Sequence, residues 1–340
     1  ITLSILRVFI YEVNMDEKLT NNTNIPLALA VWLAADDYDG SNNPKYISAT
    51  SLLKPTKQII LGKRATGVEG DITALIPTAL GSTIHAGIEK AWTTNPQASL
   101  KRLGYPQNII DKIVVNPDPK TVTKDQIPIY LEQRRTKEFN GWIIGGKFDM
   151  VANGLLHDNK TTSAFTYMYG TRDEEYREQM SIYRWLNQDI ITEDYFRINF
   201  IFTDWSKANT YTNPKYPKQR ILFRDYPFLS LDATENLIAN KLAELDTYMN
   251  EPEEGIPPCS DEELWRKPTK YKYYANASNT TGRCTKTSDD YTEAMMYWKH
   301  TKQGKGTVLT VPGSVQRCLY CKCFNMCKQR LNYGFDNVTA

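Results

Sequence analysis

Residues 141–162 read Gly-Trp-Ile-Ile-Gly-Gly-Lys-Phe-Asp-Met-Val-Ala-Asn-Gly-Leu-Leu-His-Asp-Asn-Lys-Thr-Thr. The pattern predicts two short strands, over 142–151 and 155–161. Asn153-Gly154 between them is a strong signal for the tight turn of a β-hairpin, because both residues tolerate positive φ. We therefore expect this stretch to form a hairpin in a sheet, and the other motifs of the chain are interpreted relative to it.

The two strands of this hairpin carry three charged side chains of interest. Asp149 lies near the end of the first strand, and Asp158 and Lys160 lie two residues apart on the second strand, so they share one face. Neighbouring strands are ~4.8 Å apart, so two carboxylates and one ammonium can converge on a small volume. Such a group suits a divalent cation such as Mg²⁺ and a phosphodiester. A surface hairpin with scattered charges is the alternative interpretation.

Asp149 followed by Asp158-Asn159-Lys160 resembles the signature of the PD-(D/E)XK nucleases. The sequence of residues 145–149 and 158–162 is similar to the RecB-like exonuclease branch of that superfamily, and the segment that begins Cys259-Ser-Asp-Glu-Glu-Leu-Trp resembles its bacteriophage members. The resemblance implies an α/β fold with a restriction-endonuclease-like core, in which helices flank a central mixed sheet. It also implies that Mg²⁺ or Mn²⁺ is bound at the active site.

Two further motifs stand in the same order as in that family. Gly81-x-x-x-His85 resembles its first motif, on a helix expected to start near Ser82. Gln179-x-x-x-Tyr183 resembles its last motif; the two residues are four apart and share one face of a helix expected over 171–186. Both motifs also fit ordinary helix surfaces, with a structural histidine or a tyrosine at a packed edge.

The resemblance implies a role for each site residue. His85, Asp149 and Asp158, with the backbone carbonyl of Asn159, would hold the metal, and Lys160 would position or deprotonate the attacking water. Gln179 and Tyr183 would order the site and contact DNA, with Arg177 and Arg184 as flanking phosphate contacts. Glu89 is a speculative further ligand. Glu132 could be an additional acid, but a surface charge is the preferred interpretation.

All six cysteines lie in the last quarter of the chain, which indicates metal ligation rather than disulfides. Cys318-x2-Cys321-x5-Cys327 matches the ligand triplet of iron–sulfur RecB-like nucleases. Cys259 is the first candidate for a fourth ligand, and Cys323 and Cys284 are the alternatives. Four thiolates suit Zn²⁺ or a [4Fe-4S] cluster. Lys54 stands where the iron–sulfur members have a cysteine ligand, which favours zinc. Free thiols in a helical tail with little core are the remaining alternative.

The composition is that of a globular protein, with 340 residues, 41% hydrophobic and 24% charged, and no run of ~20 apolar residues that could span a membrane. The net charge is +2, but residues 259–340 carry 13 Lys and Arg against 7 Asp and Glu. A basic tail beside an acidic body fits phosphate contact in one part and metal binding in the other, although a solvated face explains it equally well. A cytoplasmic location is expected.

Three segments are expected: an N-terminal extension with a first helix over 1–45, a nuclease core over 46–258, and a cysteine-rich segment over 259–340. Residues 1–14 are interpreted as an upstream extension or an added edge strand. Within the core we expect one helix from the Ser/Thr-rich residues 48–51 toward Leu61. Strands over 127–135 and from Trp142 are expected in one sheet, and a loop over 165–170.

The combined pattern predicts a metal-dependent deoxyribonuclease, an exonuclease by resemblance, acting in phage DNA recombination, repair or processing. The alternative is a catalytically silent DNA-binding or virion-associated protein that keeps the fold and a structural metal. A third interpretation is a nuclease active only with a recombination or single-strand-binding partner. The residues do not determine the oligomeric state.

Overall fold

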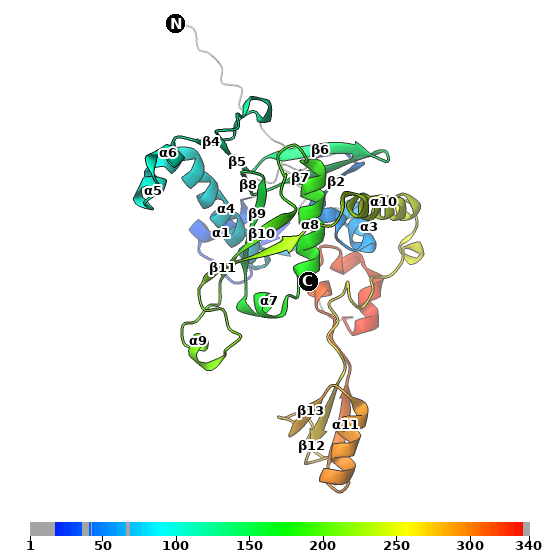
Figure 1. Cartoon of the computed structure of the whole chain (residues 1–340). Helices are drawn as coiled ribbons and strands as arrows, with labels where there is room; N and C mark the ends of the chain where they lie inside the picture. The colour runs from blue at the N-terminus through cyan, green and yellow to red at the C-terminus, as the bar shows by residue number, and fades with distance from the viewer. Residues whose placement is uncertain (1–17, 36–40, 42, 66–68, 336–340) are drawn as a thin grey trace. The chain divides into compact units, whose positions relative to one another are not determined.

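The computed structural model describes residues 18–35, 41, 43–65 and 69–335, and the chain forms two compact units (Figure 1). Unit 1 comprises residues 1–54 and 69–247, and unit 2 comprises residues 55–68 and 248–340. This division differs from the three expected segments, because residues 55–68 pack with the C-terminal unit. The expectation for residues 1–14 lies outside the described part of the chain.

The centre of unit 1 is a six-stranded mixed sheet. In spatial order its strands are β11 (Ile221–Pro227), β10 (Tyr195–Phe202), β9 (Leu155–Thr162), β8 (Met150–Ala152), β5 (Ile127–Leu131) and β4 (Ile113–Val115). The pairs β9–β10 and β4–β5 are parallel, and the other neighbours are antiparallel. Strands β11 and β4 are the two edges of this sheet.

The predicted hairpin turn is present between β8 and β9. Asn153 and Gly154 both have positive φ, 47° and 89°, as the tight turn requires. The two strands pair antiparallel, with Val151 opposite Leu156. The turn chemistry therefore sets the register that brings Asp149 beside the second strand.

The first expected strand, over 142–151, is in fact two strands in two sheets. Residues Trp142–Lys147 form β7, which joins β2 (Tyr46–Ser48) and β6 (Arg134–Phe139) in a separate three-stranded sheet, order β2-β7-β6. The expected strand over 127–135 is divided too, so only its end, in β6, shares a sheet with β7 as expected. The strand breaks at Glu132, which has a φ of 49°, so β5 and β6 belong to different sheets.

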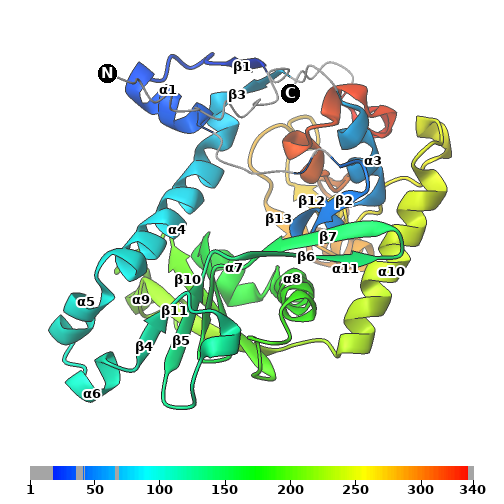
Figure 2. The same ribbon diagram turned by 90° about the horizontal axis from the view of Figure 1, so that it is seen from above.

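Helices flank the central sheet, as expected. The two that contribute to the site are α4 (Ile76–Thr94), which contacts β9, and α8 (Asp173–Leu186), which contacts β7 (Figures 1 and 2). The other helices of unit 1 are α1 (Leu27–Ala34), α2 (Ala49–Leu52), α5 (Pro96–Arg102), α6 (Gln107–Ile110), α7 (Ala164–Tyr169), α9 (Asn209–Thr212) and α10 (Leu231–Tyr248). The last residue of α10 is the first of the second stretch of unit 2. Strands β1 (Lys18–Thr20) and β3 (Glu69–Asp71) pair in parallel. Among the described residues, no helix combines the length and the apolar character needed to cross a membrane.

Several expected helix boundaries are corrected. The helix carrying His85 begins at Ile76 rather than near Ser82, so Gly81 lies inside it. A Cβ at Gly81 would lie 3.4 Å from the Thr161 hydroxyl, so this position of α4 faces β9. Residues 165–170 are mostly helical, because the Ser163 side chain caps α7. The single helix expected toward Leu61 is two, α2 and α3 (Thr56–Arg64).

Helix α8 packs closely on β7 at Gly146. A Cβ at this position would lie 2.9 Å from the ring of Tyr183 and 2.8 Å from Leu186, both on α8. The buried core on this side of the central sheet is aromatic, with Tyr176 of α8 beside Phe200 of β10. The lack of a side chain at Gly146 therefore allows α8, the helix that carries Gln179, to pack closely on β7.

Unit 2 contains α3, several short helical turns and a small sheet; Cys318 lies within one of these turns, and Cys321, Cys323 and Cys327 lie at their ends. The sheet has the order β13 (Lys286–Ser288), β12 (Lys270–Tyr274), β14 (Thr307–Val311), with α11 (Tyr291–Met296) packed against it. The expectation of a tail with little core is wrong. Leu264, Val315, Cys318 and Phe324 form a buried cluster, and the sheet adds a structured element that the sequence pattern did not predict.

We predict that Gly146→Ala destabilises unit 1 by ~1–3 kcal/mol, because the added methyl group collides with the Tyr183 ring. Thermal unfolding of the variant and of wild type measures the effect. Gly87→Ala in α4 is the matched control. Nothing lies within 4 Å of a Cβ there, and alanine is favoured over glycine in a helix, so stability should be unchanged or higher. Equal stability of Gly146→Ala and wild type would contradict the close packing.

Candidate active site

The site is built around the backbone of Asn159 in β9. Its amide donates a 2.7 Å hydrogen bond to Asp149 Oδ2, so the carboxylate that follows β7 is fixed to the neighbouring strand. Its side-chain Oδ1 accepts a 3.0 Å hydrogen bond from Asn199 Nδ2, which lies directly opposite in the register of β10. Asp149 and Asn159 therefore lie together, as the hairpin predicted.

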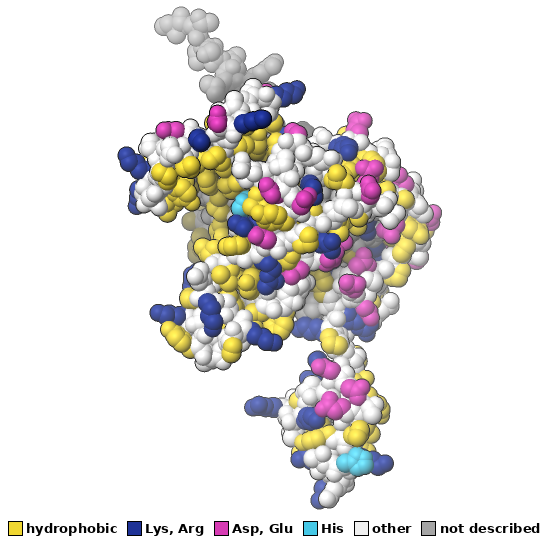
Figure 3. Space-filling model, in the orientation of Figure 1, with side chains coloured by type: hydrophobic (Ala, Val, Ile, Leu, Met, Phe, Trp, Pro, Cys, Tyr) yellow, Lys and Arg dark blue, Asp and Glu magenta, His cyan; other side chains and the backbone are white. Residues whose placement is uncertain are grey.

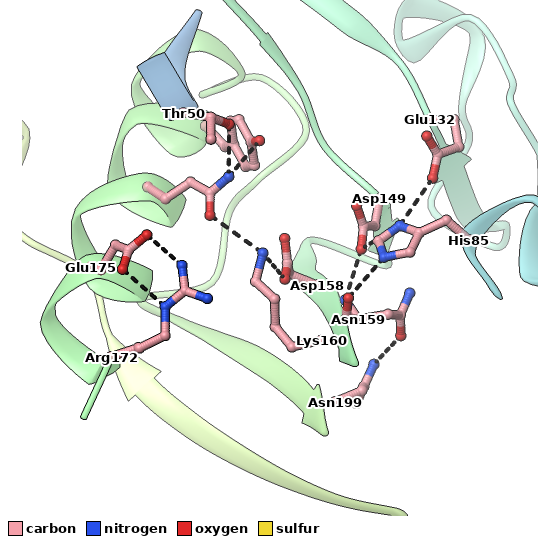
Figure 4. Close-up of polar contacts among 12 residues, drawn as sticks. Thr50, His85, Glu132, Asp149, Asp158, Asn159, Lys160, Arg172, Glu175 and Asn199 are labelled. Atoms are coloured by element: carbon pink, nitrogen blue, oxygen red, sulfur yellow. Dashed lines mark hydrogen bonds and ion pairs between the residues drawn. The ribbon is translucent and has the colours of Figure 1, made fainter. Parts of the chain in front are cut away.

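His85 reaches this point from α4. Its Nε2 lies 2.8 Å from the carbonyl oxygen of Asn159, and its Nδ1 lies 3.2 Å from Asp149 Oδ2 (Figure 4). The imidazole thus contacts both a carboxylate and a backbone carbonyl of the predicted metal group. The structure brings together His85, Asp149 and the Asn159 carbonyl, three of the four expected ligands.

Glu132 is the residue for which the sequence interpretation preferred the wrong alternative. Its side chain is 14% exposed, its Oε2 lies 2.8 Å from Lys147 Nζ, and its Oε1 lies 3.9 Å from His85 Nδ1. The interpretation as a surface charge is wrong. The positive φ of Glu132 turns the chain between β5 and β6 and leaves the side chain beside His85. No glycine or asparagine marks this break, so the local pattern carried no signal for it.

His85, Glu132 and Asp149 form a group that could hold a metal ion, since one ligand atom from each lies within 4.8 Å of the others. Glu89, on the same helix as His85, is not in this group among the described residues. Two carboxylates and a nearby carbonyl with one imidazole form a mostly hard donor set, which suits Mg²⁺ or Mn²⁺.

The charge of this group is balanced by a proton on His85. Hydrogen bonds to Asp149 and then to Glu132 raise the pKa of His85 to about 10, against the effect of burial. A metal ligand has to be the neutral imidazole, so binding of a cation here releases that proton. Metal affinity is therefore expected to rise with pH throughout the neutral range.

Asp158 and Lys160 form a second, adjacent group. Lys160 Nζ lies 2.8 Å from Asp158 Oδ2, and the Asp158 side chain is 4% exposed. Burial raises the pKa of Asp158, although the charge of Lys160 opposes this. Burial alone would lower the pKa of Lys160, but the charges of Asp158 and Asp149 outweigh it and raise that pKa above its usual range. Lys160 is therefore an ammonium at neutral pH.

The predicted Gln179–Tyr183 pair holds this lysine. Gln179 Oε1 accepts a 3.4 Å hydrogen bond from Lys160 Nζ, and its Nε2 donates to Tyr183 Oη at 3.0 Å and to Thr50 Oγ1 at 3.2 Å. Tyr183 is buried, and burial raises its pKa to about 12, so it stays neutral. Thr50, in α2, is a second partner that no motif indicated.

The two arginines expected to contact phosphate already have acidic partners. Arg177 Nη1 lies 3.7 Å from Glu174, and Arg184 Nη2 lies 3.0 Å from Asp194 and stacks over the ring of Phe228. A role for either in binding DNA would require the exchange of an ion pair for a phosphate contact.

Unit 2 holds the second candidate site. A small cavity is lined by five cysteines, Cys259, Cys318, Cys321, Cys323 and Cys327, together with α3 residues such as Lys57 and Gln58. Cys259, the expected fourth ligand, thus lies with the predicted triplet, and so does its alternative Cys323. Cys284 does not: its thiol contacts the Thr287 hydroxyl at 3.2 Å, next to β13.

Three thiols of this cavity, those of Cys259, Cys318 and Cys327, are held in the protonated form. Burial raises the pKa of Cys259 to about 12, with further contributions from Glu263 and the neighbouring cysteines, and it raises the pKa of Cys318 and Cys327 too. Buried thiolates repel one another, so only a bound cation would stabilise several at once. Crowded, buried thiols around one cavity are a donor set that fits Zn²⁺ or an iron–sulfur cluster.

Comparisons with known proteins are limited. No family model matches the chain, and no curated protein matches it. Among solved structures, the protein SSO0001 is similar over 60% of this chain and 78% of its own, with 14% identity and a TM-score of 0.36. A phage-related exonuclease from Haemophilus somnus 129PT is similar over 35% of this chain and 61% of its own, with 17% identity and a TM-score of 0.23. Likenesses this weak support no conclusion about function.

We predict that Glu132→Gln weakens Mn²⁺ binding by ~10–100-fold, because it removes a negative charge beside His85 and Asp149. Isothermal titration calorimetry at constant pH measures the affinity. Glu89→Gln, with the same chemical change on α4 outside the group, should bind Mn²⁺ like wild type. Equal affinities for all three proteins would exclude Glu132 from the metal site.

We predict that Cys318→Ser lowers the content of zinc or iron bound to the purified protein and reduces the thermal stability of unit 2. Elemental analysis with an absorbance spectrum measures both the amount and the kind of metal. Cys284→Ser is the matched control and should keep the wild-type metal content, because its thiol lies outside the cavity. Wild-type protein that carries neither metal would refute the site.

Proposed function

We propose that this protein is a metal-dependent deoxyribonuclease. The observation that carries the proposal is the placement of two groups on β9. A possible metal group of His85, Glu132 and Asp149 meets the strand at Asn159, and the next residues on either side are Asp158 and Lys160. A cation-binding group beside a fixed ammonium is what phosphodiester hydrolysis requires, since negative charge must be offset where water attacks.

The donors fit Mg²⁺ or Mn²⁺, with His85, Glu132, Asp149 and the Asn159 carbonyl as the residues that would hold the ion. When bound, such an ion supplies Lewis-acid chemistry that activates water and offsets charge on the scissile phosphate. Asp158, bound to Lys160 in this structure, is the expected additional ligand and lies one residue from the Asn159 carbonyl.

Lys160 has two conceivable roles, and its surroundings favour one. Its raised pKa keeps it protonated, so it is a poor base for removing a proton from water. As an ammonium it can instead donate hydrogen bonds to the attacking water or to a phosphate oxygen and stabilise the developing negative charge. Gln179, tied to Tyr183 and Thr50, holds the ammonium in place for this task.

We propose DNA as the substrate and exonucleolytic cleavage as the mode, on the resemblance of the Asp149, Asp158-x-Lys160 and Gln179-x-x-x-Tyr183 motifs to the RecB-like exonucleases. We also propose that the cysteines of unit 2 hold a structural Zn²⁺ or [4Fe-4S] group, with Cys259, Cys318, Cys321 and Cys327 as ligands. Cys323 lies at the same cavity and is the alternative fourth ligand.

We predict that Asp158→Asn and Lys160→Ala each reduce DNA cleavage by at least ~10²-fold, because each removes one half of the buried pair at the site. End-labelled linear DNA, incubated with Mg²⁺, Mn²⁺ or EDTA, measures the rate. Covalently closed circular DNA should resist an exonuclease. Asp232→Asn, an exposed carboxylate in the first turn of α10, is the control and should cleave like wild type.

Thermal unfolding of the two site variants establishes whether they remain folded. Cleavage at the wild-type rate by a folded Asp158→Asn or Lys160→Ala variant would exclude the assigned site. No cleavage by metal-loaded wild-type protein would instead support a silent DNA-binding protein, unless a recombination or single-strand-binding partner restores activity.

A further inference from the structure

Residues 267–313 form a small module within unit 2, defined here as the sheet module. It contains β12, β13, β14 and α11 (Figure 1). The chain enters and leaves it at one place, since the Lys267 amide donates a 3.0 Å hydrogen bond to the Ser314 carbonyl. The two segments are so close that a Cβ at Gly313 would overlap the Lys267 carbonyl. The module is thus an insertion between Cys259 and the cysteine triplet.

One face of its sheet is covered by α11 and the turn after it. The ring of Tyr271 packs on Tyr291 and the ring of Tyr273 on Tyr297, each with centroids 5.3 Å apart. Side chains alternate along a strand, so Lys270 and Lys272 of β12 point to the other face. That face is called the open face below.

The register of the sheet identifies the rest of the open face. Residues directly opposite in antiparallel strands share a face, so Thr287 of β13 and Leu309 of β14 lie beside Lys272, and Val311 lies beside Lys270. Thr287 and Leu309 are exposed, and Lys270 and Lys272 are half-exposed. The open face is therefore an accessible surface of lysine, threonine and aliphatic side chains.

The sheet module concentrates the positive charge of the chain. It has 8 Lys and Arg against 3 Asp and Glu, whereas the remaining residues have 33 against 36. Figure 3 shows Lys and Arg side chains around the margin of this module. The sheet module is therefore basic, whereas the rest of the chain is slightly acidic.

The three acids of the module do not neutralise the open face fully. Glu293 binds Lys286 and the Ser288 hydroxyl on the helix side, and Asp290 caps α11. Asp289 pairs with Lys270. Lys272 has no acidic partner among the described residues, so its charge is available to a ligand.

We propose that the open face of the sheet module binds the phosphate backbone of duplex DNA. This deepens the proposed nuclease function and rests on it for the identity of the ligand. Lysine ammonium groups and threonine hydroxyls are typical contacts to phosphate oxygens. The module would add affinity for the substrate outside the cleavage site, and would take no part in the chemical step.

The placement of the aromatic rings favours duplex over single-stranded DNA. Proteins that bind single strands offer exposed rings on which bases stack. Here Tyr271 and Tyr273 face α11, and Tyr274, the one aromatic residue of β12 on the open face, is only 8% exposed. A charged face without an exposed ring can contact the phosphate backbone of a duplex, but it provides no ring on which an unpaired base could stack.

The test is fluorescence anisotropy with a labelled 30-bp duplex and the full-length protein, without added Mg²⁺ or Mn²⁺, from 50 to 200 mM NaCl. The double variant Lys270→Ala/Lys272→Ala should bind about tenfold more weakly at 100 mM salt. The slope of log K against log salt should fall by ~0.9 for each phosphate that a lysine no longer neutralises. The fall should be ~0.9 if only Lys272 contacts phosphate and ~1.8 if Lys270 exchanges Asp289 for a second phosphate. The matched control is Lys299→Ala/Lys302→Ala, which removes the same charge from the turn that follows α11. It should keep the wild-type affinity and slope.

Three outcomes would overturn the inference: wild-type affinity in Lys270→Ala/Lys272→Ala, an equal loss in the control, or an equal loss on a labelled single strand of the same length. A cleavage assay separates this inference from the proposed function. With an active enzyme, the open-face variant should raise KM and leave kcat unchanged. If no metal ion supports cleavage but duplex binding still depends on Lys270 and Lys272, the nuclease proposal fails and the open face is supported.

Discussion

The candidate active site depends on the backbone hydrogen bonds of one residue in β9. The Asn159 amide donates to Asp149 and its carbonyl contacts His85, so a strand end, a hairpin and a helix are tied at one peptide unit. Backbone groups of a strand inside a sheet have little freedom to move, which makes them a rigid reference for the flexible side chains.

Strand β9 separates two tasks by the alternation of its side chains. Thr161 faces α4, the helix that carries His85, while Lys160 faces Gln179 of α8. The helix that carries His85 and the helix that holds the ammonium in place therefore approach the same part of β9 from different sides. The close approach of α8 is provided by Gly146 beneath it.

Much of this site could be predicted from local patterns, because its residues lie on elements with strong signals. Asn153-Gly154 specified the turn, and the spacing of Asp158 and Lys160 and of Gln179 and Tyr183 placed each pair on one face. Glu132 was interpreted as a surface charge because a residue with positive φ, and no glycine or asparagine to mark it, breaks the strand there. Thr50 was missed because its contact with Gln179 spans 129 residues of sequence.

The sequence by itself determined the hairpin, the order of the motifs and the crowding of cysteines near the C-terminus, since these follow from neighbouring residues and their spacing. Only the tertiary structure decided that 142–151 is divided between two sheets, that Glu132 joins His85, and that Cys284 lies outside the cysteine cavity. The same holds for the open face of the sheet module. These outcomes depend on strand pairing and packing between distant segments, and such contacts leave no periodic trace in the local sequence.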